Sequence, residues 1–233
     1  MSAVRQLPLP LPARTALGRE DFFVSPANAM AVAMIEAWPT WASRKCVLTG
    51  PEGAGKSHLA HVWAAQSGAR IVPGDTLAGA DIAALAATSV CVEDADRIAG
   101  DEAAEAALFH LHNLVLAEGH ALLLTARRAP NHWPLALPDL KSRMLGTQAV
   151  ALPEPDDTLL AALLAKLFAD RQTVPVGDVI PYLLTRMPRS YRAAQAIVEA
   201  LDSAALARKG AITRPLAMRV LETLEEGRND GAP

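Results

Sequence analysis

The chain has 233 residues, of which 51% are hydrophobic, and its formal net charge at pH 7 is −3. This length can form one large domain, or a medium domain with a small companion. The nearly neutral balance excludes a strongly basic surface, so tight binding of duplex DNA by this chain alone is not expected. No apolar run reaches the roughly 18–20 residues of a membrane span, and prolines interrupt the N-terminal region where a signal peptide would be apolar. We therefore expect a cytoplasmic protein without a membrane partner.

The first 18 residues predict an extended tail. Leucines alternate with prolines in the stretch QLPLPLP, and the prolines exclude a helix or a central strand. The segment is either an ordinary tail lying on the domain surface or a peptide that docks into the pockets of a partner. The residues that would dock are Gln6, Leu7, Leu9, Pro10 and Leu11.

Residues 19–152 alternate short apolar runs with helical patterns. Ser25-Pro26 predicts the start of a first helix. We then expect strands at 45–50, 70–72, 89–94 and 121–126, separated by helices at 56–68 and 102–119. The second of these helices is expected to bury one face formed by Leu108, Leu111, Leu114 and Val115. Apolar strands separated by helices predict an α/β fold with a parallel sheet covered on both faces.

Residues 153–233 show only helical patterns. Helices are expected at about 158–172, 178–187, 190–210 and 213–227, each beginning near Asp, Ser or Thr. The last two are expected to finish at Gly210 and Gly227. The sequence therefore predicts a small all-helical domain after a boundary near residue 153.

The strongest chemical signal is GPEGAGKS, which fits the phosphate-binding pattern G-x-x-x-x-G-K-[ST] between an expected strand and an expected helix. Its glycines let backbone N–H groups face phosphate oxygens at the positive end of the helix. Lys56 is expected to reach the β- and γ-phosphates and Ser57 to bind Mg²⁺. The alternative is a glycine-rich turn without a ligand. The expected nucleotide-binding residues of this loop are Pro51, Glu52, Gly53, Ala54, Gly55, Lys56 and Ser57.

Two carboxylates, those of Glu93 and Asp94, follow directly after the apolar run VCV. One can hold the water shell of a magnesium ion while the other orients an attacking water. Which carboxylate has which role stays open. The alternative is a pair of helix-capping acids at the strand exit.

Five stretches resemble the AAA+ ATPases, and among them the family of the bacterial replication initiator DnaA. These stretches are FFVSPANAMAVA, GPEGAGKSHLAH, LFHLHNLVLAEGHALLLTARR, LKSR and SYRAAQAIVEAL. The resemblance implies an AAA+ body with a helical lid that binds ATP or ADP with Mg²⁺, with Ser57 and Glu93 as metal ligands. It also implies that Val24 and Asn28 contact adenine, that Thr125 senses the γ-phosphate, and that Arg143 is an arginine finger. Arg192 matches the arginine of the second sensor helix, which implies that it lies at the nucleotide and fixes the lid against the body.

Two departures from the family qualify these expectations. Glu93 stands where the family usually has aspartate, which implies weak hydrolysis by the chain itself. After Thr125 the chain has A-R-R in place of S-D-R, which makes Thr125 a weaker candidate as a sensor.

The N-terminal QLPLPL resembles the motif that binds the bacterial sliding clamp. We also expect neither the helix-turn-helix domain nor the N-terminal assembly domain of the initiator. Together these features resemble regulators of the family that act with the DNA-loaded clamp to inactivate DnaA. The implied partners are DnaA and the clamp, with DNA reached only through the clamp, and the chain's own nucleotide is mainly structural.

Three alternatives remain at this point. The chain could be a self-assembling AAA+ motor or helicase loader, a small-molecule kinase with the same phosphate loop, or an adaptor with a vestigial ATP site. The C-terminal helical region with Arg192 and the stretch QLPLPL disfavour the kinase. The retention of Lys56, Ser57 and both carboxylates disfavours the adaptor. Whether two copies pair as a homodimer is left open.

Overall fold

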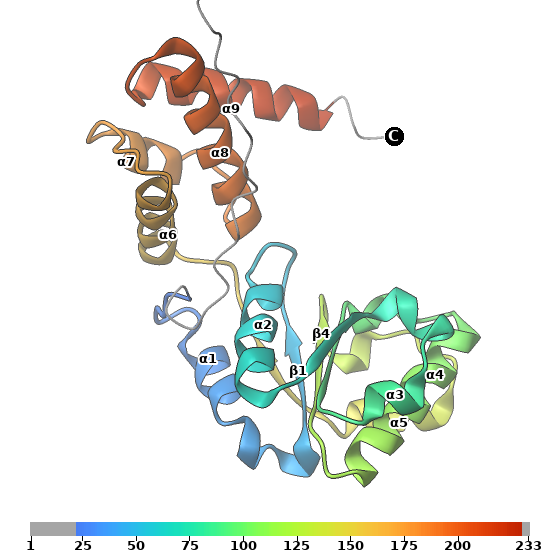
Figure 1. Ribbon diagram of the computed structural model, residues 1–233. Coiled ribbons are helices and arrows are strands. Elements are labelled where there is room, and N and C mark those ends of the chain that lie inside the picture. Colours follow the sequence, from blue (N-terminus) through green and yellow to red (C-terminus); the bar gives the residue numbers. More distant parts are fainter. Residues whose placement is uncertain (1–21, 230–233) are drawn as a thin grey trace, which may run out of the picture.

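The computed structural model describes residues 22–229 (Figure 1). Within this range, five parallel strands form one sheet in the order β2-β3-β4-β1-β5. The strands are β1 (Lys45–Thr49), β2 (Arg70–Pro73), β3 (Val90–Glu93), β4 (Leu122–Ala126) and β5 (Gln148–Ala151). This confirms the predicted α/β fold with a parallel sheet. Because all strands run the same way, the sheet has one carboxyl edge and one amino edge.

Helices cover both faces of the sheet, as Figure 1 shows, and four more helices follow it in the chain. Helices α1 and α2 cover one face, and α3, α4 and α5 the other. Their bounds are α1 (Ala29–Glu36), α2 (Lys56–Ser67), α3 (Ile82–Ala86), α4 (Glu102–Ala117) and α5 (Pro138–Leu145). The last four are α6 (Asp157–Asp170), α7 (Val179–Leu184), α8 (Tyr191–Arg208) and α9 (Arg214–Asn229). We call residues 22–152 the body and residues 153–229 the lid.

Successive side chains of each strand point to opposite faces of the sheet, and the body therefore has two hydrophobic cores. In β1, Val47 packs into the core under α4, whereas Cys46 and Leu48 pack into the core under α1 and α2. The same alternation continues in β4, where Leu122 and Leu124 join the first core. Successive side chains of a strand point to opposite faces, so a strand that is apolar throughout serves two buried faces.

The lid has its own hydrophobic core and well-defined helix starts. Its core is built from apolar residues of α6 to α9, among them Leu160, Phe168 and Leu201. The side chain of Asp156 accepts a hydrogen bond from the N–H of Leu159, and the Ser190 hydroxyl accepts one from the N–H of Ala193. These caps satisfy donors that helix starts leave unpaired.

Several expected elements differ in detail. Helix α1 begins at Ala29 rather than at Ser25-Pro26, because the Ser25 hydroxyl and carbonyl first hold a turn, bonded to the N–H groups of Ala27 and Ala29. In α4, Leu114 is 40% exposed, so its expected burial was wrong. The short elements α3, α5 and β5 were not predicted. In the described range, no helix combines the length and apolar character that a membrane crossing requires.

Candidate functional site

The phosphate loop follows β1 at the carboxyl edge and leads into α2. Gly53 and Gly55 have φ angles of 77° and 101°, in the left-handed region that favours glycine. A Cβ atom at Gly53 would lie 2.5 Å from the Cβ of Ser190 in the lid, and the Gly53 carbonyl accepts a hydrogen bond from the N–H of Tyr191. The loop therefore needs glycine both for its backbone and for the close approach of α8.

Lys56 is buried inside the curl of the loop. Its Nζ donates hydrogen bonds to the carbonyl oxygens of Gly50, at 2.8 Å, and Pro51, at 2.9 Å. Burial lowers the pKa of Lys56, and the negative charges of Asp94 and Asp96 oppose that effect. The ammonium group is thus held at the centre of the loop, while Ser57 is exposed at the start of α2.

Acidic residues stand at the carboxyl end of β3. Glu93 ends the strand, and its Oε1 is buried without a hydrogen-bond partner in the described part of the chain. Such an oxygen suits a cation, and together with the Ser57 hydroxyl it offers the oxygen ligands that Mg²⁺ prefers. The N–H of Asp94 donates to the hydroxyl of Thr125, at 3.1 Å, on the neighbouring strand β4. Among the described residues, no cluster of three or more His, Cys, Asp or Glu side chains could hold a metal ion by itself.

Two residues of this edge were missed by the sequence analysis. Asp96 accepts a hydrogen bond at Oδ2 from the N–H of Arg127, at 3.0 Å, and its Oδ1 is buried without a partner among the described residues. Arg127 follows β4 and extends toward the loop. The spacing Glu-Asp-x-Asp after a buried strand was the available signal for Asp96, and the pair Arg127-Arg128 for the arginine.

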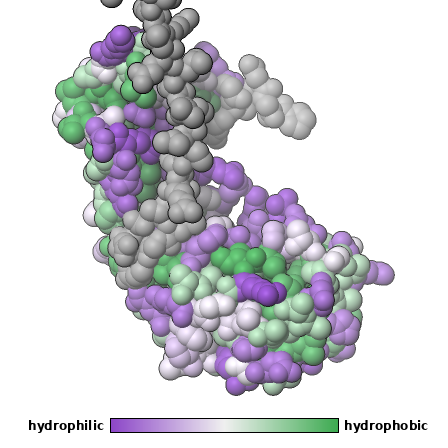
Figure 2. All heavy atoms as spheres, viewed as in Figure 1, coloured by the Kyte–Doolittle hydropathy of each residue, from purple (hydrophilic) through white to green (hydrophobic). Residues whose placement is uncertain are grey.

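The lid meets the phosphate loop through an ion-pair bridge. Oε1 of Glu52 lies 2.7 Å from Nη1 of Arg192, and Oε2 of Glu52 lies 2.7 Å from Nη2 of Arg127. Figure 2 shows hydrophilic residues gathered where lid and body meet on the face in view. Arg192 was expected at the nucleotide, and the structure places it directly beside the phosphate loop.

The segment before α1 borders the other side of the loop. Val24 is half exposed, whereas Asn28 is buried, and the Asn28 side chain is bonded to the N–H of Ser25 and the carbonyl of Phe23. Asn28 therefore shapes this segment. Tyr191 stacks on Phe22 at 6.1 Å between ring centroids, and burial raises the pKa of Tyr191 to about 12. The expected adenine contacts of Val24 and Asn28 stay predictions.

Arg143 lies away from this loop, in the last turn of α5. Its side chain is exposed, and its guanidinium lies over the ring of Phe109 in α4, 5.2 Å from the centroid. The Arg143 carbonyl accepts hydrogen bonds from Lys45 Nζ, at 3.0 Å, and from the Thr147 hydroxyl, at 2.8 Å. Lys45 is the first residue of β1, so α5 ends at the amino edge of the sheet.

The expected clamp-binding residues Gln6, Leu7, Leu9, Pro10 and Leu11 lie outside the described residues. The division of the chain near residue 153 and the roles of the site residues remain predictions.

No family model matches the chain. Among solved structures, domain III of the Thermotoga maritima replication initiation protein DnaA is similar, with a TM-score of 0.76, 16% identity, and 91% of this chain and 98% of that chain covered. The chain has the AAA+ P-loop fold. AMPPCP-bound DnaA from Aquifex aeolicus is also similar, with a TM-score of 0.66 and 19% identity, over 77% of this chain and 63% of that one.

A point mutant of Thermotoga maritima RuvB shares the same AAA+ fold. Its TM-score is 0.65 at 18% identity, with 85% of this chain and 68% of that chain covered. At these identities the likeness concerns the fold.

Proposed function

We propose that the chain is a nucleotide-dependent regulator of replication initiation, which stimulates ATP hydrolysis by a DnaA initiator and so inactivates it. In this role it resembles Hda, the regulatory inactivator of DnaA. The AAA+ fold shared with DnaA domain III supports the class of protein. The catalytic group supplied to the partner is the Arg143 guanidinium.

The position of Arg143 carries this proposal. Its helix end is anchored to the first residue of β1, whereas the phosphate loop follows the last residue of that strand. Five residues of strand span roughly 16 Å, more than one arginine side chain can bridge. An exposed arginine at that edge suits a triphosphate held by another polypeptide, where such fingers accelerate hydrolysis by about 10³ to 10⁵.

The chain's own nucleotide has a supporting role in this proposal. Lys56 and the loop N–H groups bind the phosphates, and Arg192 links the lid to the loop. Ser57 and Glu93 would hold Mg²⁺, which when bound neutralises charge on the β- and γ-phosphate oxygens. The bound nucleotide thus sets how lid and body are joined.

The N-terminal motif supplies recruitment by the sliding clamp. The double substitution Gln6→Ala with Leu7→Ala is expected to weaken clamp binding by about tenfold or more, because a few residues carry most of the binding energy of an interface. The dissociation constant for purified clamp measures this, with Val4→Ala as the control for a neighbouring apolar residue. An unchanged dissociation constant in the double variant would favour the alternative, in which this segment is an ordinary surface tail.

A reconstituted reaction tests the proposal as a whole. ATP-bound DnaA is mixed with this chain and clamp-loaded DNA, and phosphate release is followed. We expect release to rise only when chain, clamp and DNA are all present. The proposal is contradicted if adding this chain does not change the rate of phosphate release.

A second candidate is a self-assembling AAA+ ATPase or helicase-loader-like protein. The observation that favours it is the same exposed Arg143, which could equally serve a neighbouring copy of this chain. Nucleotide-dependent rings in size-exclusion chromatography, together with rapid ATP turnover by the isolated chain, would support this candidate. Slow turnover by a small species would support the first.

A further inference from the structure

A single carboxylate joins three parts of the nucleotide site. Glu52 is the third residue of the phosphate loop, and each of its two oxygens faces a different arginine at 2.7 Å. Arg192 comes from lid helix α8, and Arg127 from the segment after β4. Glu52 therefore connects loop, lid and sheet through two ion pairs.

Both arginines lie beside the phosphate loop, each paired with its Glu52 carboxylate. Arg127 is close enough to Lys56 for its charge to act on that ammonium group, and its own N–H is bonded to Asp96. Arg192 lines a 460 Å³ cleft between loop and lid together with Glu52 and Gly53. Guanidinium groups bind carboxylates and phosphates with the same paired geometry. The partners that Glu52 holds are thus suitable phosphate ligands.

We propose that the Glu52 carboxylate is an intramolecular competitor for the terminal phosphate of a nucleoside triphosphate, and so a determinant of nucleotide choice at this site. The inference rests on the proposed nucleotide binding. A diphosphate leaves both Glu52 ion pairs intact, with the lid held to the loop. A triphosphate draws Arg127 and Arg192 toward its third phosphate, and this separates them from Glu52.

The expected change in relative nucleotide affinity depends on how exposed the ion-paired side chains are. The side chains of Glu52, Arg127 and Arg192 are 54%, 55% and 79% exposed. Exposed ion pairs are weak because water and salt screen them. Removing two such pairs is therefore expected to change the relative affinity for tri- and diphosphate by roughly three- to tenfold, rather than by orders of magnitude.

Substitution of Glu52 tests the competition in the full chain. The dissociation constants of Mg·AMPPCP and Mg·ADP are measured by calorimetry for the wild type and for Glu52→Gln, which keeps the size of the side chain but removes its charge. We expect AMPPCP to bind more tightly relative to ADP, by roughly three- to tenfold. Glu225→Gln is the matched control, because Glu225 lines the same cleft and should leave the ratio unchanged.

The outcomes separate this inference from the proposed function. An unchanged ratio in Glu52→Gln, with both nucleotides still bound, overturns the competitor role and leaves the nucleotide site intact. An equal loss of affinity for both nucleotides also overturns it, since Glu52 would then support the loop as a whole. A wild-type chain that binds neither nucleotide overturns the nucleotide site and this inference with it.

Discussion

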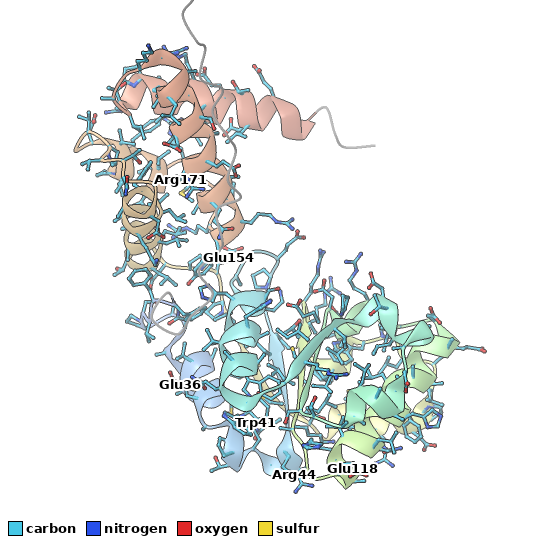
Figure 3. All side chains as sticks on the ribbon, viewed as in Figure 1. Glu36, Trp41, Arg44, Glu118, Glu154 and Arg171 are labelled. Carbon is cyan, nitrogen blue, oxygen red and sulfur yellow. The ribbon has the colours of Figure 1, made fainter. Side chains whose placement is uncertain are left out.

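The two edges of the sheet are built from different kinds of contact. At the carboxyl edge, the loop, the lid and the segment after β4 meet through exposed ion pairs centred on Glu52. At the amino edge, the end of α5 rests on the ammonium of Lys45, which is only 8% exposed and also bonds the ring of His112 at 3.2 Å. Figure 3 shows the labelled Arg44 and Glu118 at the amino edge, and Glu154 in the connection to the lid.

This difference indicates two tasks. Exposed ion pairs can exchange partners at little cost, which suits a site that binds and releases a ligand. A buried ammonium bonded to a helix carbonyl resists rearrangement, because an unpaired buried polar group is costly. Under the proposed function, the carboxyl edge is thus suited to change, and the amino edge to hold the end of α5 in one position.

The largest expected effect tests the role given to the amino edge. Arg143→Ala should abolish stimulation of DnaA hydrolysis, a loss of about 10³ to 10⁵, while folding and nucleotide binding are kept. Phosphate release in the reconstituted reaction measures it. Lys141→Ala, also exposed on α5, is the control. Full stimulation by Arg143→Ala would remove the residue from the mechanism.

The next prediction concerns the close approach of lid and loop at the carboxyl edge. Gly53→Ala places a Cβ 2.5 Å from that of Ser190 and gives a non-glycine residue a φ of 77°. We expect nucleotide affinity to fall by about 30-fold or more, from roughly 1–3 kcal/mol of strain together with displacement of α8. Calorimetric titration with ADP measures the loss.

A second substitution separates the clash from the backbone strain. Ser190→Gly removes the atom that a Cβ at residue 53 would meet, at a cost of only a few tenths of a kcal/mol as a helix cap. The double variant should therefore recover part of the affinity. No recovery would mean that the contact with α8 is unimportant for binding.

A pH-dependent prediction concerns the start of α5. The buried Glu105 carboxylate accepts hydrogen bonds from the N–H groups of Gly100, Ala136 and Leu137. Burial by itself raises the pKa of Glu105, but these backbone bonds outweigh it and hold the pKa below its usual value. A carboxyl group with a depressed folded-state pKa stabilises the protein above its unfolded pKa, and this contribution is lost as the pH falls through the folded value.

Glu105→Gln should accordingly lower the free energy of unfolding by about 2 kcal/mol at pH 7. The difference from the wild type should shrink as the pH falls through the depressed pKa. Urea unfolding at pH 7 and at acidic pH measures both quantities. A difference that stays constant with pH would show that the Glu105 charge contributes nothing.

The smallest expected effect concerns the hydrogen bond from Lys45 to the Arg143 carbonyl at the end of α5. Lys45→Met keeps an unbranched side chain, one atom shorter than that of lysine, but leaves the Arg143 carbonyl without the ammonium donor. We expect a loss of about 1–2 kcal/mol in the free energy of unfolding and a fall of roughly five- to tenfold in stimulated hydrolysis. DnaA binding should be unchanged, because Arg143 itself is kept. Equal stimulation by variant and wild type would show that the finger needs no such anchor.

The sequence by itself determined the longer helices, four of the five strands and the phosphate loop. Buried strands such as KCVLT contain consecutive apolar residues, and helix starts such as Ser190 carry their own capping groups, so the signal is local. The edge strand β5 was missed because it has only four residues and is partly exposed. Leu114 matched the helical period, yet nothing in the described part of the fold covers it fully.

Only the tertiary structure decided which charged groups meet. Glu52 is separated from Arg127 by 75 residues and from Arg192 by 140, and Lys45 from Arg143 by 98. Hydrophobic periodicity specifies the faces of helices and strands, but it carries no information on which exposed charges become neighbours. That depends on how lid, loop and sheet pack together. The same packing places Arg143 at the edge opposite to the phosphate loop, because the end of α5 is bonded to the first residue of β1.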